Sequence, residues 1–229
     1  MKIQFLWHSF FKIAFGNTNV LVDPFINIPE GEATYRSLIK FPANIDKIKG
    51  IDFICVSNEQ FDHFDRATVE AFAKRDGATV VAHESVLNEL DIPSNLKHAV
   101  NVGSRFNLRG VDVSVLGAHY PNSFYPLSFC FSRDAESLFF AGNTALMDSF
   151  SDIKCDVAIL PIGGNSTMDV VDAVRATKTM KPKFVIPMHY NSFESIGADP
   201  KDFSSRIEKS ILKTVPIILK PGQSFKTGA

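Results

Sequence analysis

The sequence predicts an α/β sandwich in which two mixed β-sheets pack face to face and helices cover their outer sides. Short β-type runs occur in both halves of the chain, and amphipathic helical segments are interposed between them. No repeat or low-complexity linker divides the 229 residues. This order of elements is typical of helices packed outside sheets. We therefore expect a single α+β domain over residues 1–229, which is within the size range of one large domain.

The first half is expected to open with antiparallel strands and to continue with alternating strands and helices. Gly16-Asn17 marks a turn, and Asp65 is placed to cap a helix in which Val69, Phe72 and Ala73 follow helical spacing. The strands are expected at 2–7, 11–16, 18–25, 50–57, 77–83, 98–102 and 105–119, the last divided by a turn at 109–110, and the helices at 66–75 and 84–90.

The second half begins with a Phe-rich hairpin over 127–142 that turns at 133–136. Its Phe side chains are expected in the core, because aromatic rings supply large buried area. A helix over 168–181 is expected to bury Val170, Val171, Val174 and Thr177 on one side. The other expected elements are strands at 155–163, 182–190 and 214–222 and a helix at 200–212.

Charge and cysteine content narrow the choice of partners. The chain has 24 Lys and Arg against 25 Asp and Glu, a net charge of -1, so the overall charge favours neither nucleic acid nor a membrane surface as a partner. A small-molecule substrate is the better expectation, and a homo-oligomer stays open. No run approaches the roughly 18 apolar residues of a membrane span. Cys55, Cys130 and Cys155 are far apart and are expected to be free thiols, as in a reducing, cytoplasmic setting.

Polar residues that could form a site follow the ends of predicted strands. Loops at strand ends can bring such side chains together at one edge without disturbing the core. The residues in these positions are Asp62, His63, His119, Asn143, Asn165 and His189.

Several stretches together resemble the metallo-β-lactamase fold, and within it the metal-dependent hydrolase branch that includes relatives of ascorbate-6-phosphate lactonase. The resemblance covers nearly the whole chain. It implies a four-layer αββα sandwich with a two-metal site between the sheets. The stretches that carry it are "LWHSFFKI", "VLVDPF", "FDHFD", "LGAHYPNS", "FFAGNTALM", "VAILPIGGNSTM", "FVIPMHYNSF" and "LKPGQSF".

The resemblance also assigns metal ligands, of which three are substituted. The family's first metal loop, His-x-His-x-Asp-His, reads Asn58 to His63 here, so Asn58 and Gln60 replace its two leading histidines. The next family histidine matches His119, and the last matches His189. The family's metal-bridging aspartate matches Asn143.

These changes fall unevenly on the two metal positions. The first would keep only His119 with two carboxamides, which are poor substitutes for imidazole toward zinc. The second would keep Asp62, His63 and His189, a set that suits zinc but also manganese or iron. The resemblance thus implies one metal ion at most, with Asn143 removing one negative charge from the site.

The function implied by the resemblance is hydrolysis of an ester, lactone or phosphoester. Asp62 would orient or deprotonate the attacking water, and His8 would act beside it; Asn165 and Tyr190 would position the substrate. Two other interpretations stay open. In the first, the chain is an inactive, metal-free member of the family that binds a ligand or a protein. In the second, the three amides are introduced substitutions in an otherwise active protein.

Overall fold

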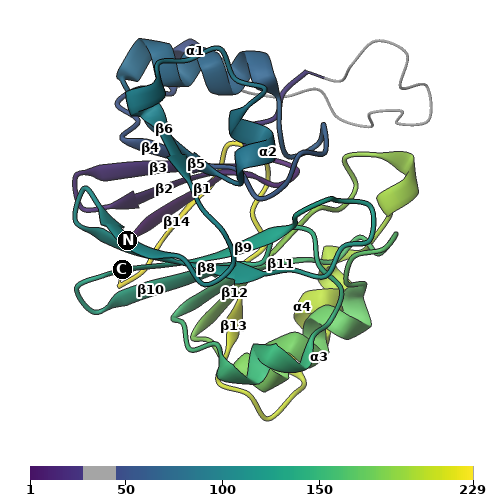
Figure 1. Cartoon of the computed structure of the whole chain (residues 1–229). Coiled ribbons are helices and arrows are strands. Elements are labelled where there is room, and N and C mark those ends of the chain that lie inside the picture. The colour runs from purple at the N-terminus through teal and green to yellow at the C-terminus, as the bar shows by residue number, and fades with distance from the viewer. Residues whose placement is uncertain (28–44, 229) are drawn as a thin grey trace.

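The computed structural model describes residues 1–27 and 45–228 and contains two β-sheets packed face to face (Figure 1). The strands of the first sheet are Lys2–Trp7 (β1), Phe10–Phe15 (β2), Thr18–Val22 (β3), Phe53–Cys55 (β4), Thr79–Ala82 (β5), Lys97–Ala99 (β6) and Ser224–Lys226 (β14). Those of the second are Arg105–Leu108 (β7), Val111–Gly117 (β8), Leu127–Arg133 (β9), Glu136–Phe140 (β10), Val157–Pro161 (β11), Phe184–Met188 (β12) and Val215–Pro216 (β13).

Both sheets are mixed. Their orders are β14-β1-β2-β3-β4-β5-β6 and β13-β12-β11-β10-β9-β8-β7. Strands β1 to β3 and β7 to β10 run antiparallel, whereas β3 to β6 and β10 to β13 are parallel. Because neighbouring parallel strands end at the same sheet edge, the loops after them are placed to share a site. Pairing of β14 with β1 brings the two ends of the chain side by side (Figure 1).

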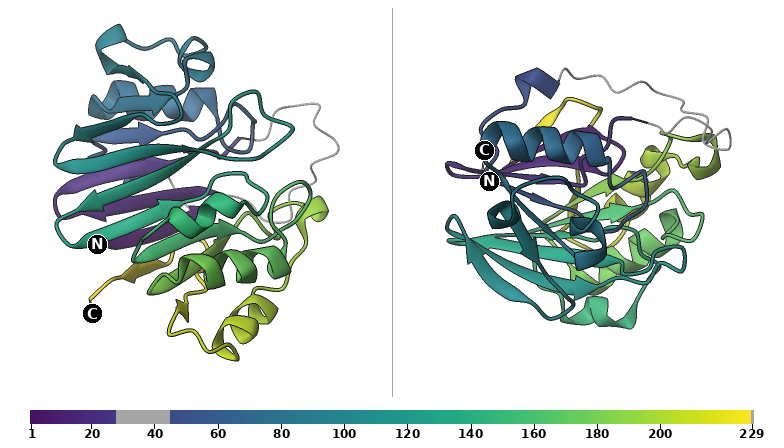
Figure 2. Two further views of the ribbon diagram at one scale, coloured as in Figure 1. Left: turned by 60° about the horizontal axis from the view of Figure 1, so that its bottom comes forward. Right: turned by 45° about the horizontal axis from the view of Figure 1, so that its top comes forward.

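Helices cover the outer side of each sheet (Figures 1 and 2). The helices Arg66–Asp76 (α1) and Glu84–Leu87 (α2) lie over the first sheet, and Val170–Met180 (α3) and Pro200–Glu208 (α4) lie over the second. The predicted cap of α1 is confirmed, since an Asp65 carboxylate oxygen accepts from the Thr68 amide at 3.2 Å. The predicted sandwich of two mixed sheets with helices outside is likewise confirmed.

Phenylalanine rings from both sheets fill the space between them. Phe11 of β2 meets Phe140 of β10 with ring centroids 6.2 Å apart, and Phe15 meets Phe131 at 6.3 Å. All four side chains are at most 1% exposed, so the Phe-rich hairpin belongs to the core as predicted. Complete burial of one such side chain contributes about 1.5–3 kcal/mol.

The structure corrects several predicted elements. Helix α4 ends at Glu208 rather than 212, where the Ser210 hydroxyl donates to the Ile207 carbonyl at 2.6 Å and competes with further helical bonding. The strand expected over 214–222 is only two residues long, Val215–Pro216 (β13), because Pro216 has no N–H donor to continue the sheet hydrogen bonds. Val171, expected on the buried side of α3, is 41% exposed. Strand β14 was not predicted.

The cysteines are unpaired, as expected. Cys55 is buried, and burial raises the pKa of Cys130 to about 11 and that of Cys155 to about 12. Thiols with such pKa values hold little reactive thiolate at neutral pH. No helix within 1–27 and 45–228 is both long and apolar enough to span a bilayer.

Candidate metal centre

Four buried side chains converge where strands of the two sheets end. His8 lies in the turn between β1 and β2, Asp62 and His63 follow β4, and His189 directly follows β12. One potential ligand atom from each lies within 4.8 Å of those of the other three. The structure thus brings together Asp62, His63 and His189, expected as metal ligands, and His8, expected to act beside Asp62.

The Asp62 carboxylate lies at the centre of this group. Its Oδ2 atom is 3.3 Å from His8 Nε2, 3.4 Å from His189 Nε2 and 3.9 Å from His63 Nε2. Three imidazole nitrogens therefore face one carboxylate oxygen. Three nitrogen donors and one oxygen donor are a set that zinc, manganese and iron(II) accept.

Asp23, at the end of β3, orients His63. His63 Nδ1 donates to Asp23 Oδ2 at 2.6 Å, while the Ser57 amide and hydroxyl each donate to the same carboxylate at 2.7 Å. With its proton held on Nδ1, His63 presents the lone pair of Nε2 to the site. Sequence reasoning missed Asp23, although its place after the strand "VLV" is the same signal that identified Asp62.

Several polar atoms in the centre are buried without a partner. Within the described chain, His63 Nε2, both ring nitrogens of His189 and both amide atoms of Asn143 have no hydrogen bond. Buried polar groups in folded proteins are nearly always satisfied, by protein, by water or by an ion. Of these atoms, His63 Nε2 and His189 Nε2 lie within 4 Å of Asp62 Oδ2, so these residues fit a bound cation.

Charge interactions shift the pKa values within the group. Burial alone would raise the pKa of the Asp62 carboxyl, but the charge of His63 and the contacts with His189 and His8 hold it well below its usual range. Burial favours the neutral ring of His63, yet the charges of Asp62 and Asp23 raise its pKa, so a bound cation would displace the proton from its Nε2 atom. Burial, assisted by His189, lowers the pKa of His8 to about 3. A neutral His8 and an ionised Asp62 are the protonation states that a metal ion requires of its ligands.

The backbone is strained at three of these positions. His8, Asp23 and His189 have φ angles of 54°, 48° and 54°, in the left-handed region that favours glycine. Each such residue costs of order 1–3 kcal/mol and persists only where its surroundings hold it. Here the His189 amide donates to the His8 carbonyl at 3.0 Å, which joins the two loops.

The substituted loop residues form hydrogen bonds within the protein, although Gln60 also lines the opening to the centre. Asn58 Oδ1 accepts from the Gln60 amide at 3.0 Å, and Gln60 Nε2 donates to the Asn122 carbonyl at 2.8 Å. Between them, Glu59 accepts from the Ser123 hydroxyl and from the backbone amide of Phe124. Glu59 and Gln60 therefore hold the loop that follows β8 in place by hydrogen bonds.

His119 lies on that same loop and is exposed. It is not one of the four residues of the cluster, although its amide donates to the Thr144 hydroxyl at 3.0 Å. With Asn58 and Gln60 already hydrogen-bonded and His119 exposed, the residues at the family's first metal position do not fit an ion. The buried Asn143 instead lies beside His63.

A narrow opening of about 20 Å³ reaches the centre, room for roughly one water molecule. Asn165, predicted to contact substrate, lines it. Tyr190 does not; its side chain is partly buried, and burial raises its pKa to about 12. The sequence prediction missed Tyr120 and Phe193, which carry no strand-end signal. The complete lining is Gln60, Phe61, Asp62, Tyr120, Asn165, His189, Phe193, Ser195 and Ile196.

Replacing Asp23 by Asn should weaken metal binding without removing a ligand. The amide keeps the size of the side chain but loses the charge that fixes the His63 tautomer, so we expect the affinity for zinc to fall by about 10–100-fold. Competition with a chromophoric chelator measures this. Asp52→Asn is the matched control, since Asp52 accepts from the Asn19 amide at the other end of the same strands. Equal affinities of the two variants would contradict the role of Asp23.

Comparison with known proteins places the chain in a family. A family model described as a beta-lactamase superfamily domain matches residues 2–189. A UPF0173 metal-dependent hydrolase of Carboxydothermus hydrogenoformans is 33% identical, over 97% of this chain and 98% of the relative. A UPF0173 metal-dependent hydrolase of Pyrococcus furiosus is also 33% identical, over 99% of each chain.

Solved structures agree with this placement. Igni18, described as a metallo hydrolase from Ignicoccus hospitalis, superposes with a TM-score of 0.81 at 26% identity and 98% coverage of both chains. An isothiocyanate hydrolase from Delia radicum gut bacteria gives the same TM-score at 14% identity, covering 99% of this chain and 98% of that one, which shows a shared fold. The chain therefore belongs to the beta-lactamase superfamily, as a homologue of the UPF0173 metal-dependent hydrolases.

Proposed function

We propose that this protein is a hydrolase that uses one divalent metal ion to cleave a small ester, lactone or phosphoester. The observation that carries the proposal is the cluster of His8, Asp62, His63 and His189, whose donor atoms lie within 4.8 Å of one another in a buried setting. The names of the relatives support metal-dependent hydrolysis. Zinc is the first expectation, and manganese or iron(II) also suit three nitrogens and one oxygen.

His8 adds a donor to a site that lacks the carboxylate which the family has at Asn143. Its Nε2 faces Asp62, and the Ser192 hydroxyl hydrogen-bonds its Nδ1 and fixes the ring. A neutral imidazole adds a donor without restoring the lost negative charge. The complete set is then His8, Asp62, His63 and His189, with a single carboxylate.

The chemistry follows from the positions of these residues. A divalent ion bound here would polarise the scissile carbonyl or phosphoryl group and acidify a water. The free carboxylate oxygen of Asp62 would orient the attacking water by accepting a hydrogen bond from it, because the low pKa keeps this carboxylate ionised. Asn165 and Tyr120, at the opening, would hold the substrate, and the narrow entrance would favour a slender reacting group.

An inactive, metal-free binding protein is the second candidate, which one observation favours. Asn58 and Gln60 are hydrogen-bonded within the protein and need no ion. Such a protein would keep the fold and the opening but would bind its ligand unchanged.

Metal analysis combined with a hydrolysis assay separates the two candidates. Protein purified without chelator should carry about one ion per chain, located by anomalous scattering, and should hydrolyse at least one of a p-nitrophenyl ester, a γ-lactone and p-nitrophenyl phosphate. Activity should disappear with a chelator and return with zinc or manganese. Absence of metal after incubation with excess zinc and manganese would overturn the proposal. Metal without hydrolysis of any of these substrates would overturn the proposed reaction but not the metal site, whereas absence of metal would favour the metal-free binding protein.

A further inference from the structure

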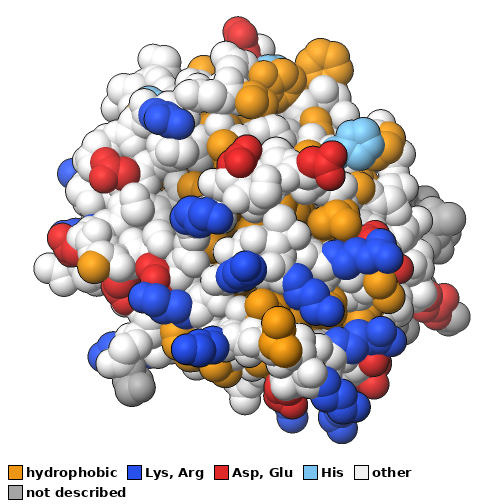
Figure 3. All heavy atoms as spheres, turned by 90° about the horizontal axis from the view of Figure 1, so that it is seen from below, with side chains coloured by type: hydrophobic (Ala, Val, Ile, Leu, Met, Phe, Trp, Pro, Cys, Tyr) orange, Lys and Arg blue, Asp and Glu red, His pale blue; other side chains and the backbone are white. Residues whose placement is uncertain are grey.

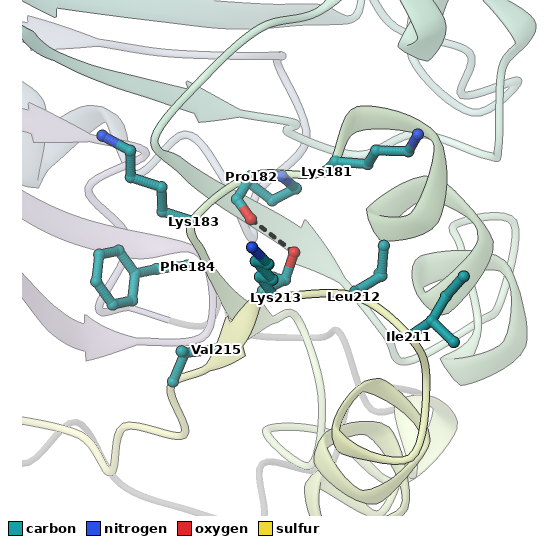
Figure 4. Close-up of a pocket in the computed structure, with 9 residues that line it drawn as sticks. Lys181, Pro182, Lys183, Phe184, Ile211, Leu212, Lys213 and Val215 are labelled. Atoms are coloured by element: carbon teal, nitrogen blue, oxygen red, sulfur yellow. Dashed lines mark hydrogen bonds between the residues drawn. The ribbon is translucent and has the colours of Figure 1, made fainter.

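Two hollows on the outer side of the second sheet are lined by cationic side chains. The larger, of about 530 Å³, lies between the turn that joins α3 to β12 and the segment that joins α4 to β13 (Figure 4). Lys181, Lys183 and Lys213 line it. The Thr214 hydroxyl donates to the Pro182 carbonyl at 2.6 Å, which ties the two segments together.

The second hollow, of about 360 Å³, lies between α3 and α4 and is lined by four more cations. No acidic residue lines either hollow. The seven cations are called the basic face below, and Figure 3, which looks onto this side of the molecule, shows Lys and Arg side chains spread over it. They are Arg175, Lys178, Lys181, Lys183, Arg206, Lys209 and Lys213.

Much of this positive charge is not neutralised. Within the described chain, three members of the basic face pair with Asp172, Asp156 and Asp202. The other four have no ion pair there; they are Lys178, Lys181, Lys209 and Lys213. The protein as a whole has a net charge of -1, so these four lysines are a local excess of positive charge. The sequence-based expectation that no membrane is a partner rested on the net charge of the whole chain.

Apolar side chains project from the same surface. Ile211 is fully exposed, and Lys209 and Lys213 flank it in the chain. Val215 and Val171 are 47% and 41% exposed. These three are half of the six large apolar side chains that are exposed in the described part of the molecule, and all three line the hollows. Figure 4 shows Ile211 directed away from the sheet.

Three occupants can be compared on these observations. A second copy meeting this face by a two-fold contact would oppose seven cations with seven, which is repulsive. Single-stranded nucleic acid binds proteins by stacking its bases on exposed aromatic rings. The aromatic ring in the larger hollow, Phe184, instead packs against Phe225 with ring centroids 4.8 Å apart, which disfavours nucleic acid. An anionic lipid surface suits both the lysines and the exposed aliphatic side chains, since its headgroups attract lysines and its acyl chains take up aliphatic groups.

We propose that the basic face docks the protein reversibly on an anionic membrane surface, with Ile211 inserted among the lipid chains. The lysines around it contact the headgroups. This contact lies on the outer side of α3 and α4 and involves none of the metal-centre residues, so it does not depend on the proposed hydrolysis.

Vesicle co-sedimentation tests the proposal. The full chain should bind vesicles of phosphatidylcholine mixed with phosphatidylglycerol and should bind pure phosphatidylcholine vesicles at least about tenfold more weakly. High salt should release it. The double variant Lys209→Ser/Lys213→Ser should reduce binding by about tenfold or more, and Ile211→Ser should reduce it at unchanged charge.

Matched controls use the same substitutions elsewhere. Lys47 and Lys49 are exposed beside the first sheet, and Val102 is 52% exposed away from the basic face. Lys47→Ser/Lys49→Ser and Val102→Ser should bind like the unchanged protein, and thermal unfolding should show that every variant is folded.

Three results would overturn the proposal. The first is that the protein binds both kinds of vesicle equally, or that it binds neither. The second is loss of binding in the controls as large as in the basic-face variants. The third is preference for another partner: capture of an oligonucleotide or polyglutamate without vesicle binding, or a dimer in light scattering that Ile211→Ser dissociates.

Discussion

Replacing His189 by Ala is expected to abolish metal binding while the protein stays folded. Its Nε2 is one of four converging donors, and neither of its ring nitrogens has a hydrogen bond within the described chain. Removal takes away the 3.4 Å contact of His189 with Asp62, but Asp62 keeps its contact with His8 at 3.3 Å. Loss of one ligand from a four-donor site should reduce affinity by more than about 100-fold, since even supporting partners of ligands contribute 10–100-fold. Elemental analysis after dialysis measures the loss.

Two further histidine variants sharpen this result. His98→Ala, which removes a histidine outside the cluster, should leave metal content unchanged. His63→Ala should lose metal and also stability, because the buried Asp23 carboxylate would lose the hydrogen bond from His63 Nδ1, at a cost of about 1–3 kcal/mol. A metal content near one ion per chain in His189→Ala would contradict the assigned ligand set.

Replacing Gly163 by Ala is expected to disrupt the centre without touching a ligand side chain. A Cβ atom at Gly163 would lie 2.2 Å from the His189 carbonyl oxygen and 2.9 Å from Ile196 Cβ. Backbone this close must move, and His189 would carry its bond to the His8 carbonyl with it. We expect destabilisation of at least about 1–3 kcal/mol together with much weaker metal binding. Urea unfolding and metal titration measure the two effects.

Gly197 offers the matched control. A Cβ atom there would meet no atom within 4 Å, and its φ of -71° suits any residue. Gly197→Ala should therefore retain both stability and metal. If Gly163→Ala behaved in the same way, the coupling between the end of β11 and the metal centre would be refuted.

The positions of three of the four clustered residues could be predicted from the sequence because they depend on strand ends. Asp62, His63 and His189 each follow a buried apolar run, and parallel strands bring such ends to one edge. The same logic applies to the αββα sandwich, whose strand and helix patterns are strong. Local patterns predicted two sheets with helices outside, but strand ends also marked His119, Asn143 and Asn165, and only the resemblance to the metallo-β-lactamase fold distinguished Asp62, His63 and His189 as candidate ligands.

The remaining features depend on contacts between distant segments. His8 joins the cluster because its turn lies against His189, which is 181 positions later in the chain. The hydrogen bond from His63 to Asp23 joins the loop after β4 to the end of β3. The exposure of His119 follows from how residues 58–60 fasten its loop. No periodicity in the sequence encodes these contacts.

The left-handed backbone at His8, Asp23 and His189 has a consequence for laboratory evolution. Glycine adopts this conformation without penalty, so glycine at any of the three positions would relieve local strain. Selection for heat resistance alone would then favour variants that lack a ligand or its support. Libraries of this protein should therefore be screened for retained metal alongside thermal tolerance, because the two properties are opposed at these three residues.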